Sequence, residues 1–387
     1  MPKRQLMTTN PSRLLIRSRR IDMYSLFSGA VMDAAAAVPA HFGNPFAEEE
    51  SLRRGRSVTD LSFLEVITVA GVDRKTWLHN LSTCPFNEMA AGESREMLIL
   101  DPHGHIEHAA AVTDDGETIW LITDTGKAQL LIDFLESMKF MMRVDIKRVP
   151  AVVLGVSTSL SEFSEDVRAT HSEMALVAWE DPWPRTLPGG ADYGLADDVH
   201  PARNTHRTLL VLGEQSAPVV VEKLLGEGMT PVGLVAWEAA RIVDRRPRAA
   251  LDAADQPLPH ELDWIRTAVH LNKGCYRGQE TVAKLVNLGR PPRRFTYLYL
   301  EGPEGDLPAP GTEVFRGERR VGVLTSVARD FEEGPVGLAL IKRSTPVSDQ
   351  LRVGDFVAVQ EEIVSAEGKS SVSPQERPGS ELRKGAK

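Results

Sequence analysis

One eight-residue run, Lys273-Gly274-Cys275-Tyr276-Arg277-Gly278-Gln279-Glu280, constrains this chain more than any other stretch. It contains a thiol, a phenol, two cations, an amide and a carboxylate. Its two glycines let the backbone turn sharply and approach a ligand closely, because glycine adopts positive φ without steric cost. Apolar residues then recur at roughly helical spacing as far as Gly289, which predicts a helix directly after the run.

This arrangement places Cys275 just before a helix N-terminus, between Lys273 and Arg277. The helix dipole and the two cations stabilise a thiolate, so we expect the pKa of Cys275 to be lowered. Glu280 suits the start of the helix, and Gln279 can fix the loop. The alternative is that Cys275 is only a small buried side chain and that the last two residues only cap the helix.

The motif K-G-C-Y-x-G-Q-E resembles the signature of the YgfZ family, folate-binding proteins of iron–sulfur cluster assembly and repair. These proteins are relatives of the glycine-cleavage T protein, an aminomethyltransferase. The similarity runs from about Ala30 to about Val364 and includes the PLPHEL segment before the motif. The resemblance implies an α+β, T-protein-like fold in several subdomains around a central channel, followed by a C-terminal antiparallel β-barrel.

The resemblance also implies a ligand and site residues. The ligand is tetrahydrofolate or a one-carbon derivative, and no bound metal is expected. Cys275 is the implied catalytic residue. Arg241 matches an arginine that contacts ligand in the glycine-cleavage relatives, and arginine binds carboxylates such as those of folate bidentately. The implied folate-binding residues are Arg241, Lys273, Tyr276 and Gln279, and the loop-forming residues are Gly274, Gly278 and Glu280.

The segment around Arg241 fits this reading only in part. The relatives have R-I-E-A-G where this chain has Arg241-Ile242-Val243-Asp244-Arg245. The alternative is that the four arginines between Arg241 and Arg248 form a solvated basic surface.

The turn at Asp101-Pro102-His103-Gly104 leads into the strand where the glycine-cleavage relatives carry adjacent aspartates. The segment from Gly104 to Ala109 has no such pair. Its absence counts against aminomethyl transfer but leaves folate binding possible, so whether the chain is an enzyme stays open.

Composition narrows the class of protein. A length of 387 residues favours two or three domains. A net charge of −9 argues against direct nucleic-acid binding. No apolar run is long enough for a membrane span. The cysteines are Cys84 and Cys275, too few for a disulfide framework or an ordinary cluster site, so iron–sulfur clusters would belong to client proteins.

The chain divides into four parts by sequence. Residues 1–22 form a basic extension, read either as a mitochondrial transit peptide or as an upstream extension before a true start at Met23. The first reading places the protein in the mitochondrial matrix and the second in a bacterial cytoplasm. Residues 23–290 form the folate-binding region of two α+β subdomains, 291–364 the barrel, and 365–387 a disordered tail.

Alternating patterns predict strands and helices in the folate-binding region. Strands are predicted at Leu61–Val69, Met97–Leu100, Ile106–Val112, Ile119–Thr123, Val144–Ile146, Val152–Val156, Ala175–Trp179 and Thr208–Leu212. Helices are predicted over residues 48–56, around Trp77, over 125–140, after Ser216, from Thr230-Pro231 to about Val243, and over Pro259–His270. Short strands with Gly/Pro turns follow from Phe295, which indicates a small barrel or sandwich.

Two other groups of side chains can be interpreted either as ligand-binding residues or as ordinary structural residues. His103, His105, Glu107 and His108 suggest metal ligands, but alternation along a strand points at most two of them the same way. Turn and surface roles are therefore favoured, with His105 or Glu107 as possible linings of a ligand channel. Trp179, Trp183 and Tyr193 can stack on a flat ring or simply belong to the core.

Three functions are consistent with the sequence. The preferred one is a tetrahydrofolate-binding accessory protein for iron–sulfur client enzymes that uses Cys275. The second is a folate-dependent one-carbon transferase or demethylase. The third is a non-catalytic adaptor that binds client proteins, including tRNA-modifying enzymes, through the Arg241–Arg248 surface.

Overall fold

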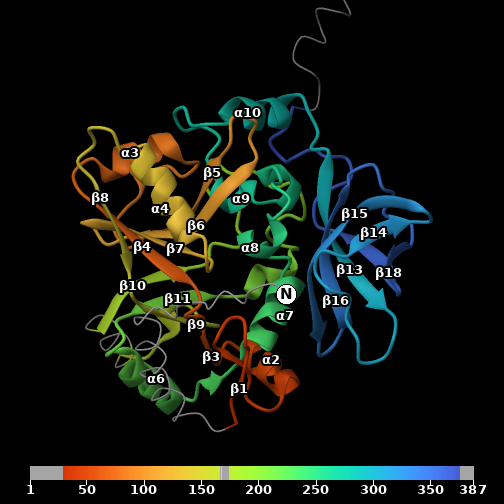
Figure 1. The fold of residues 1–387 in the computed structure, drawn as a ribbon, viewed down its shortest axis with the longest axis horizontal. Coiled ribbons are helices and arrows are strands. Elements are labelled where there is room, and N and C mark those ends of the chain that lie inside the picture. The colour runs from red at the N-terminus through yellow and green to blue at the C-terminus, as the bar shows by residue number, and fades with distance from the viewer. Residues whose placement is uncertain (1–28, 166, 168–173, 375–387) are drawn as a thin grey trace, which may run out of the picture.

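The computed structural model describes residues 29–165, 167 and 174–374. Figure 1 shows two layered sheet regions beside a barrel, with α10 (Gln279–Asn287) at one end and α2 (Pro45–Arg53) at the other. The predicted basic extension lies outside the described residues, as do residues 375–387 of the predicted tail. None of the helices in the described ranges has the length and apolar character that a membrane crossing requires.

The first sheet has the strand order β10-β11-β9-β3-β12. Its strands are β3 (Ser57–Asp60), β9 (Val152–Val156), β10 (Ala175–Glu180), β11 (Thr208–Leu212) and β12 (Thr230–Pro231). Alternate residues of β9 pack on opposite faces: Leu154 packs with α6 (Ala217–Gly226), and Val153 packs with α7 (Leu234–Val243). The sheet is thus covered on both faces, which is why β9 is continuously apolar.

The second sheet is antiparallel, in the order β5-β6-β7-β4-β8. Its strands are β4 (Glu65–Ala70), β5 (Ser94–Leu100), β6 (Ile106–Asp114), β7 (Thr118–Thr123) and β8 (Asp145–Val149). Met97 and Ile99 pack toward α3 (Arg74–Leu81) and α4 (Ala128–Ser137). Leu98 and Leu100 point to the other face and join the core that holds Tyr276.

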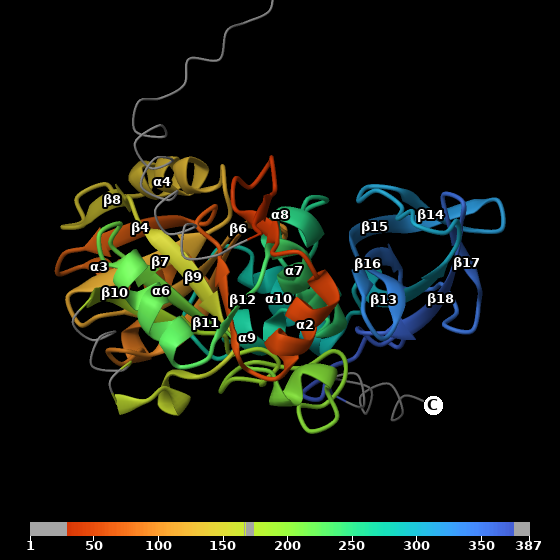
Figure 2. The same ribbon diagram turned by 90° about the horizontal axis from the view of Figure 1, so that it is seen from below.

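The barrel is closed and has six strands, in the order β13-β16-β15-β14-β17-β18. They are β13 (Arg293–Glu301), β14 (Glu313–Arg316), β15 (Arg319–Asp330), β16 (Gly334–Lys342), β17 (Leu351–Val353) and β18 (Phe356–Glu362). Leu298 and Ala339 belong to its interior, whereas Tyr297 and Leu338 join the core shared with the rest of the chain. The barrel lies at one end of the molecule (Figure 2). The expected α+β architecture and C-terminal antiparallel barrel are confirmed.

Short elements complete the described ranges. They are β1 (Val31–Met32), β2 (Pro39–His41), η1 (Phe86–Glu88), η2 (Leu160–Glu162), η3 (Pro201–Asn204), α8 (Ala249–Asp252), η4 (Pro259–Leu262) and α9 (Ile265–Ala268).

Three local predictions were wrong. Thr230-Pro231 does not start a helix but pairs in parallel with β3, and α7 begins after Gly233. The predicted helix Pro259–His270 is broken into η4 and α9, because Asp263 between them is left-handed (φ 55°). The predicted strand Leu61–Val69 is strand only from Glu65, since Leu64 N–H closes a turn onto Leu61.

Residues 365–374 of the predicted tail are described by the structure and bond to the rest of the chain. Ser365 N–H donates to the carbonyl of Tyr193, and Ser371 N–H donates to the carbonyl of Asp192. These bonds hold the start of that segment against the loop before η3.

Candidate functional site

The run 273–280, hereafter the signature loop, is fastened to the end of α3 by Lys273. This side chain is buried, and its Nζ donates to the carbonyl oxygens of His79 and Ser82. Carbonyls at a helix C-terminus lack intrahelical partners and attract a cation. Nζ also lies 4.9 Å from the ring centroid of Tyr276. Burial lowers the pKa of Lys273 to about 8.

The loop is fastened on its other side to the turn between β5 and β6. Gly278 is left-handed (φ 80°) and caps α10. A Cβ added there would lie 2.6 Å from the carbonyl oxygen of Asp101 and 3.0 Å from Cα of Gly104. Only glycine allows both this φ and this approach. Gly274, by contrast, has no heavy atom nearer than 3.8 Å to an added Cβ.

Polar side chains of the loop make further internal contacts. Arg277 Nη1 donates to Glu107 Oε2 on β6 at 2.7 Å. Gln279 Nε2 donates to the carbonyl of Lys273 at 3.3 Å, which closes the loop on itself. Glu280 is exposed in the first turn of α10. The two cations expected to flank the thiol are therefore directed to α3 and β6.

The two cysteines lie in opposite environments. Cys275 is exposed, whereas Cys84 is buried and burial raises its pKa to about 12. Cys275 is therefore the thiol that a partner molecule can reach, and the interpretation as a small buried side chain was wrong. Tyr276 beside it is 7% exposed and belongs to the core; its hydroxyl has no hydrogen-bond partner among the described residues.

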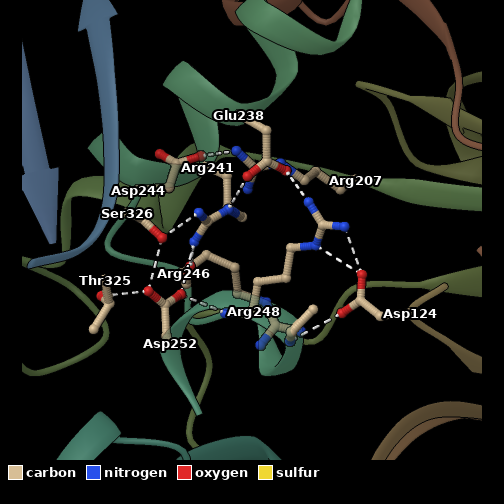
Figure 3. Close-up of polar contacts among 11 residues, drawn as sticks. Asp124, Arg207, Glu238, Arg241, Asp244, Arg246, Arg248, Asp252, Thr325 and Ser326 are labelled. Carbon is tan, nitrogen blue, oxygen red and sulfur yellow. Dashed lines mark hydrogen bonds and ion pairs between the residues drawn. The ribbon is translucent and has the colours of Figure 1, made fainter. Parts of the chain in front are cut away.

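A set of buried and half-buried arginines and carboxylates, hereafter the central arginine network, lies between the sheets and the barrel (Figure 3). Its members are Asp124, Arg207, Glu238, Arg241, Asp244, Arg246, Arg248, Asp252, Thr325 and Ser326. Arg241 donates to Glu238 at 2.9 Å, to Asp252 at 3.0 Å and to Ser326 Oγ at 2.8 Å, and it also bonds the carbonyl of Arg246. Because Ser326 is on β15, Arg241 joins α7 to the barrel.

The neighbouring arginines are also paired. Arg248 bonds Asp124 at 2.5 Å and Glu238 at 3.1 Å, and Arg246 bonds Glu96 at 2.6 Å and Asp181 at 3.0 Å. The carboxylates hold the pKa of both arginines above its ordinary value despite burial. The basic surface proposed for Arg241–Arg248 is therefore wrong: Arg241, Arg245 and Arg246 are buried.

Comparisons with known proteins show which proteins this chain is similar to. No protein-family model matches the chain. A chloroplastic Arabidopsis thaliana protein, named as a transferase, is 26% identical over 361 residues, which cover 89% of this chain and 77% of that protein. The tRNA-modifying protein YgfZ of Vibrio atlanticus is 22% identical over 231 residues, 59% of this chain and 64% of that protein. An aminomethyltransferase of a Synechococcus strain is 23% identical over 349 residues, 81% and 88% of the two chains.

The solved structure of the glycine cleavage system aminomethyltransferase T from Bartonella henselae superimposes with a TM-score of 0.69 at 18% identity, covering 91% of this chain and 98% of that one. The chain is similar to proteins named YgfZ and to aminomethyltransferases. It has the aminomethyltransferase fold, as the signature loop predicted. It spans slightly less than two thirds of the Vibrio YgfZ proteins.

In this chain, the strand expected to carry adjacent aspartates is β6. Glu107 on β6 is exposed and paired with Arg277. His108 packs on Phe134 at 5.5 Å between ring centroids, and burial lowers its pKa. Neither position offers a free carboxylate.

The aromatic side chains considered for ring stacking belong to the core. Trp179, Trp183 and Tyr193 are all buried. Trp183 Nε1 donates to the carbonyl of Asp244 at 2.9 Å, and Trp179 Nε1 donates to that of Arg95 at 2.7 Å. The structure favours the core interpretation for all three.

The sequence did not reveal two features of this site. One is Asp101, which was read only as a turn residue but accepts hydrogen bonds from its own turn. The other is a cleft of about 450 Å³, bordered by the end of α2, η3 and the end of α7. Its lining residues include Leu52, Arg54, Ser157, Thr205, His206 and Asp244. Because its lining is spread over distant segments, no local pattern could have revealed it.

Proposed function

We propose that this protein binds a reduced folate and serves iron–sulfur cluster assembly or repair in client enzymes, among them enzymes that modify tRNA. The observation that carries the proposal is the exposed Cys275 in a loop fixed at both ends. An exposed thiol on a rigid support can meet a partner molecule without an ordering cost. The similarity to proteins named YgfZ and aminomethyltransferase supports the folate part of the proposal.

The residues at the centre suit a folate, which carries glutamate carboxylates and a polar ring. Arg207 Nε and Arg246 Nη1 are buried donors that lack an acceptor among the described residues. A carboxylate or ring carbonyl would satisfy them, and buried unpaired donors are costly. We propose that these two arginines act with the predicted ligands Arg241, Lys273, Tyr276 and Gln279.

The role of each predicted ligand differs in this proposal. Arg241 already bonds two carboxylates, so it would hold the folate tail only together with its neighbours. Tyr276 offers its unpaired hydroxyl, and Lys273 and Gln279 hold the loop in place. A bound reduced folate would supply a one-carbon unit or reducing electrons. Cys275 would act at the surface as a nucleophile or redox thiol toward the client protein.

A folate-dependent one-carbon transferase is the alternative. It is favoured by the similarity to aminomethyltransferases across most of the chain. The exposed and ion-paired Glu107 beside His108, where the glycine-cleavage relatives have aspartates, argues against it. Incubation with methylene-tetrahydrofolate and amine donors discriminates: turnover at enzymatic rates would favour the transferase.

The main test uses thermal unfolding with tetrahydrofolate and its one-carbon forms, on the wild type and on Cys275→Ala. A ligand that binds the native state raises the melting temperature by mass action, without any known reaction. We expect both proteins to be stabilised equally, and only the wild type to restore client iron–sulfur enzyme activity in cells that lack the protein. Absence of stabilisation by any reduced folate would overturn the folate part of the proposal. The remaining function would be the adaptor, which would then have to bind its clients through a surface other than Arg241–Arg248. Full complementation by Cys275→Ala would remove the thiol from the function.

For localisation, we propose a reducing compartment. This is the bacterial cytoplasm, or the mitochondrial matrix if residues 1–22 direct import. The similar Arabidopsis protein is named as chloroplastic.

A further inference from the structure

The turn that supports the signature loop contains an oriented histidine. Asp101 Oδ1 accepts the backbone N–H groups of His103 and His105, both at 2.8 Å. Asp101 N–H donates to the carbonyl of His105 at 2.8 Å, so the turn is closed at its base. The second carboxylate oxygen, Oδ2, lies 3.1 Å from Nδ1 of His105. The His105 ring is thus tied to the carboxylate of its own turn.

This contact fixes which ring nitrogen is free. A carboxylate accepts a hydrogen bond, so Nδ1 of His105 carries the proton and Nε2 keeps its lone pair when the ring is neutral. Partial burial opposes ionisation of Asp101, but the hydrogen bonds from His105 and His103 prevail and lower its pKa. The His105 side chain is 39% exposed, so Nε2 can exchange protons with a neighbouring group. Carboxylate-oriented histidines of this kind serve as general bases in enzymes.

The signature loop rests on this same turn. Gly278 abuts the carbonyl of Asp101 and Cα of Gly104, the residue before His105. Arg277, two residues after Cys275, pairs with Glu107, two residues after His105. Two independent contacts thus bring the segment with the exposed thiol beside the segment with the oriented imidazole.

We propose that His105, oriented by Asp101, is the acid–base group of the Cys275 site. The proposal rests on the proposed function, in which Cys275 is the reactive thiol. In the step, the S–H bond of Cys275 breaks and its proton passes to Nε2 of His105 through water. The electron pair remains on sulfur, and Nδ1–H stays bonded to Asp101. The resulting imidazolium returns this proton when the sulfur is released from its partner.

The surrounding charges are compatible with this role. From the turn, Asp101 and His103 face the imidazole, the His103 ring at 6.5 Å between centroids. From β6 and the signature loop, Glu107 and Arg277 largely neutralise each other. Glu280 on α10 is exposed. Asp101 is thus the carboxylate bonded to the His105 ring, and this bond holds the ring in one orientation.

The test is the rate at which iodoacetamide alkylates Cys275 between pH 5 and 9, followed by mass spectrometry. Cys84 is buried, so modification reports Cys275. A thiolate paired with an imidazolium reacts at pH values where an ordinary thiol does not. We expect the wild type to be alkylated faster than a variant that lacks the imidazole base. The rate for His105→Gln at pH 7 should be about tenfold lower than that of the wild type. His103→Gln is the matched control, because His103 is exposed in the same turn and its ring has no carboxylate partner among the described residues.

Asp101→Asn provides a second measurement, because it replaces the carboxylate that bonds Nδ1 of His105 with a neutral amide. It should also lower the alkylation rate at pH 7, and its melting temperature verifies that the turn is intact. Identical pH profiles for the wild type and His105→Gln would overturn the proposal. The assay uses neither folate nor client, so its failure is separate from a failure of folate binding.

Discussion

The carbonyl oxygen of Asp101 lies 2.6 Å from the position that a Cβ on Gly278 would occupy. This contact joins the signature loop to the β5–β6 turn, and the positive φ of Gly278 adds a second reason for glycine there. Two segments separated by more than 170 residues therefore share one rigid support.

The first prediction concerns this glycine. Gly278→Ala should lower the free energy of unfolding by about 1–3 kcal/mol, from overpacking and from the left-handed φ. It should also shift the alkylation rate of Cys275, because the loop must move. Gly274→Ala is the matched control, since its Cβ would meet no heavy atom within 3.4 Å. Urea unfolding measures both variants, and equal stabilities would contradict the close approach.

The second prediction concerns Lys273. Lys273→Met leaves the carbonyls of His79 and Ser82 without their donor, which should cost about 1.5–3 kcal/mol of unfolding free energy. Lys284→Met removes an exposed lysine from α10 and should change stability by less than about 0.5 kcal/mol. Hydrogen exchange at the end of α3 should rise only in the first variant. An unchanged exchange rate there would mean that the lysine does not hold the loop to α3.

Local sequence patterns correctly predicted the helices and strands whose own residues are enough to favour them, whatever their partners in the fold. Strand β9 was predicted with its observed bounds, because a short run of Val and Leu between turn signals strongly favours a buried strand. Helix α10 followed from spacing and the terminal Gly289. Thr230-Pro231 failed because its pairing partner, β3, lies far away in the sequence.

The charge of the Arg241–Arg248 segment was misread for the same reason. The carboxylates that neutralise it come from distant positions: Asp124 is 124 residues from Arg248, and Glu96 is 150 residues from Arg246. A sequence shows four arginines, and only the fold shows that three of them are buried and that the fourth, Arg248, is half-buried and paired with Asp124. The role of Asp101 likewise depends on the side chain of His105 turning back onto it.

The third prediction concerns the junction between α7 and the barrel. Arg241→Met leaves Glu238 with one cation and Asp252 without its arginine, and both carboxylates are poorly exposed. Removal of one partner from such a buried network costs about 3–5 kcal/mol. We expect calorimetry to show a lower melting temperature, with unfolding of the barrel at a lower temperature than that of the sheets. Ser326→Ala removes a hydroxyl that accepts from Arg241 and donates to Asp252, and it should cost about 1.5–3 kcal/mol. Equal effects of the two variants would contradict the central role of the guanidinium.

The fourth prediction concerns a carboxyl pair that links α2 to the barrel. Glu49 is 1% exposed, and Arg53 beside it bonds Asp330 at the end of β15. Burial, followed by a hydrogen bond and repulsion from Asp330, raises the pKa of Glu49 to about 8. Between its ordinary pKa of 4.5 and about 8, the folded state thus binds a proton that the unfolded state has released. The contribution of Glu49 to stability is complete below pH 4.5 and declines as pH rises to about 8.

Glu49→Gln removes this titration, because glutamine does not ionise, while it keeps a side chain of the same size that can still form hydrogen bonds. The variant should therefore gain stability relative to the wild type as pH rises from 5 to 8, with a difference of at most about 1.4 kcal/mol per pH unit. Glu50→Gln is the control, because Glu50 is half exposed and pairs with Arg54 on the same helix. Urea unfolding at several pH values measures the difference. A Glu49→Gln curve parallel to the wild type would show that Glu49 ionises normally in the fold, and the link between α2 and β15 would then be an ordinary ion pair.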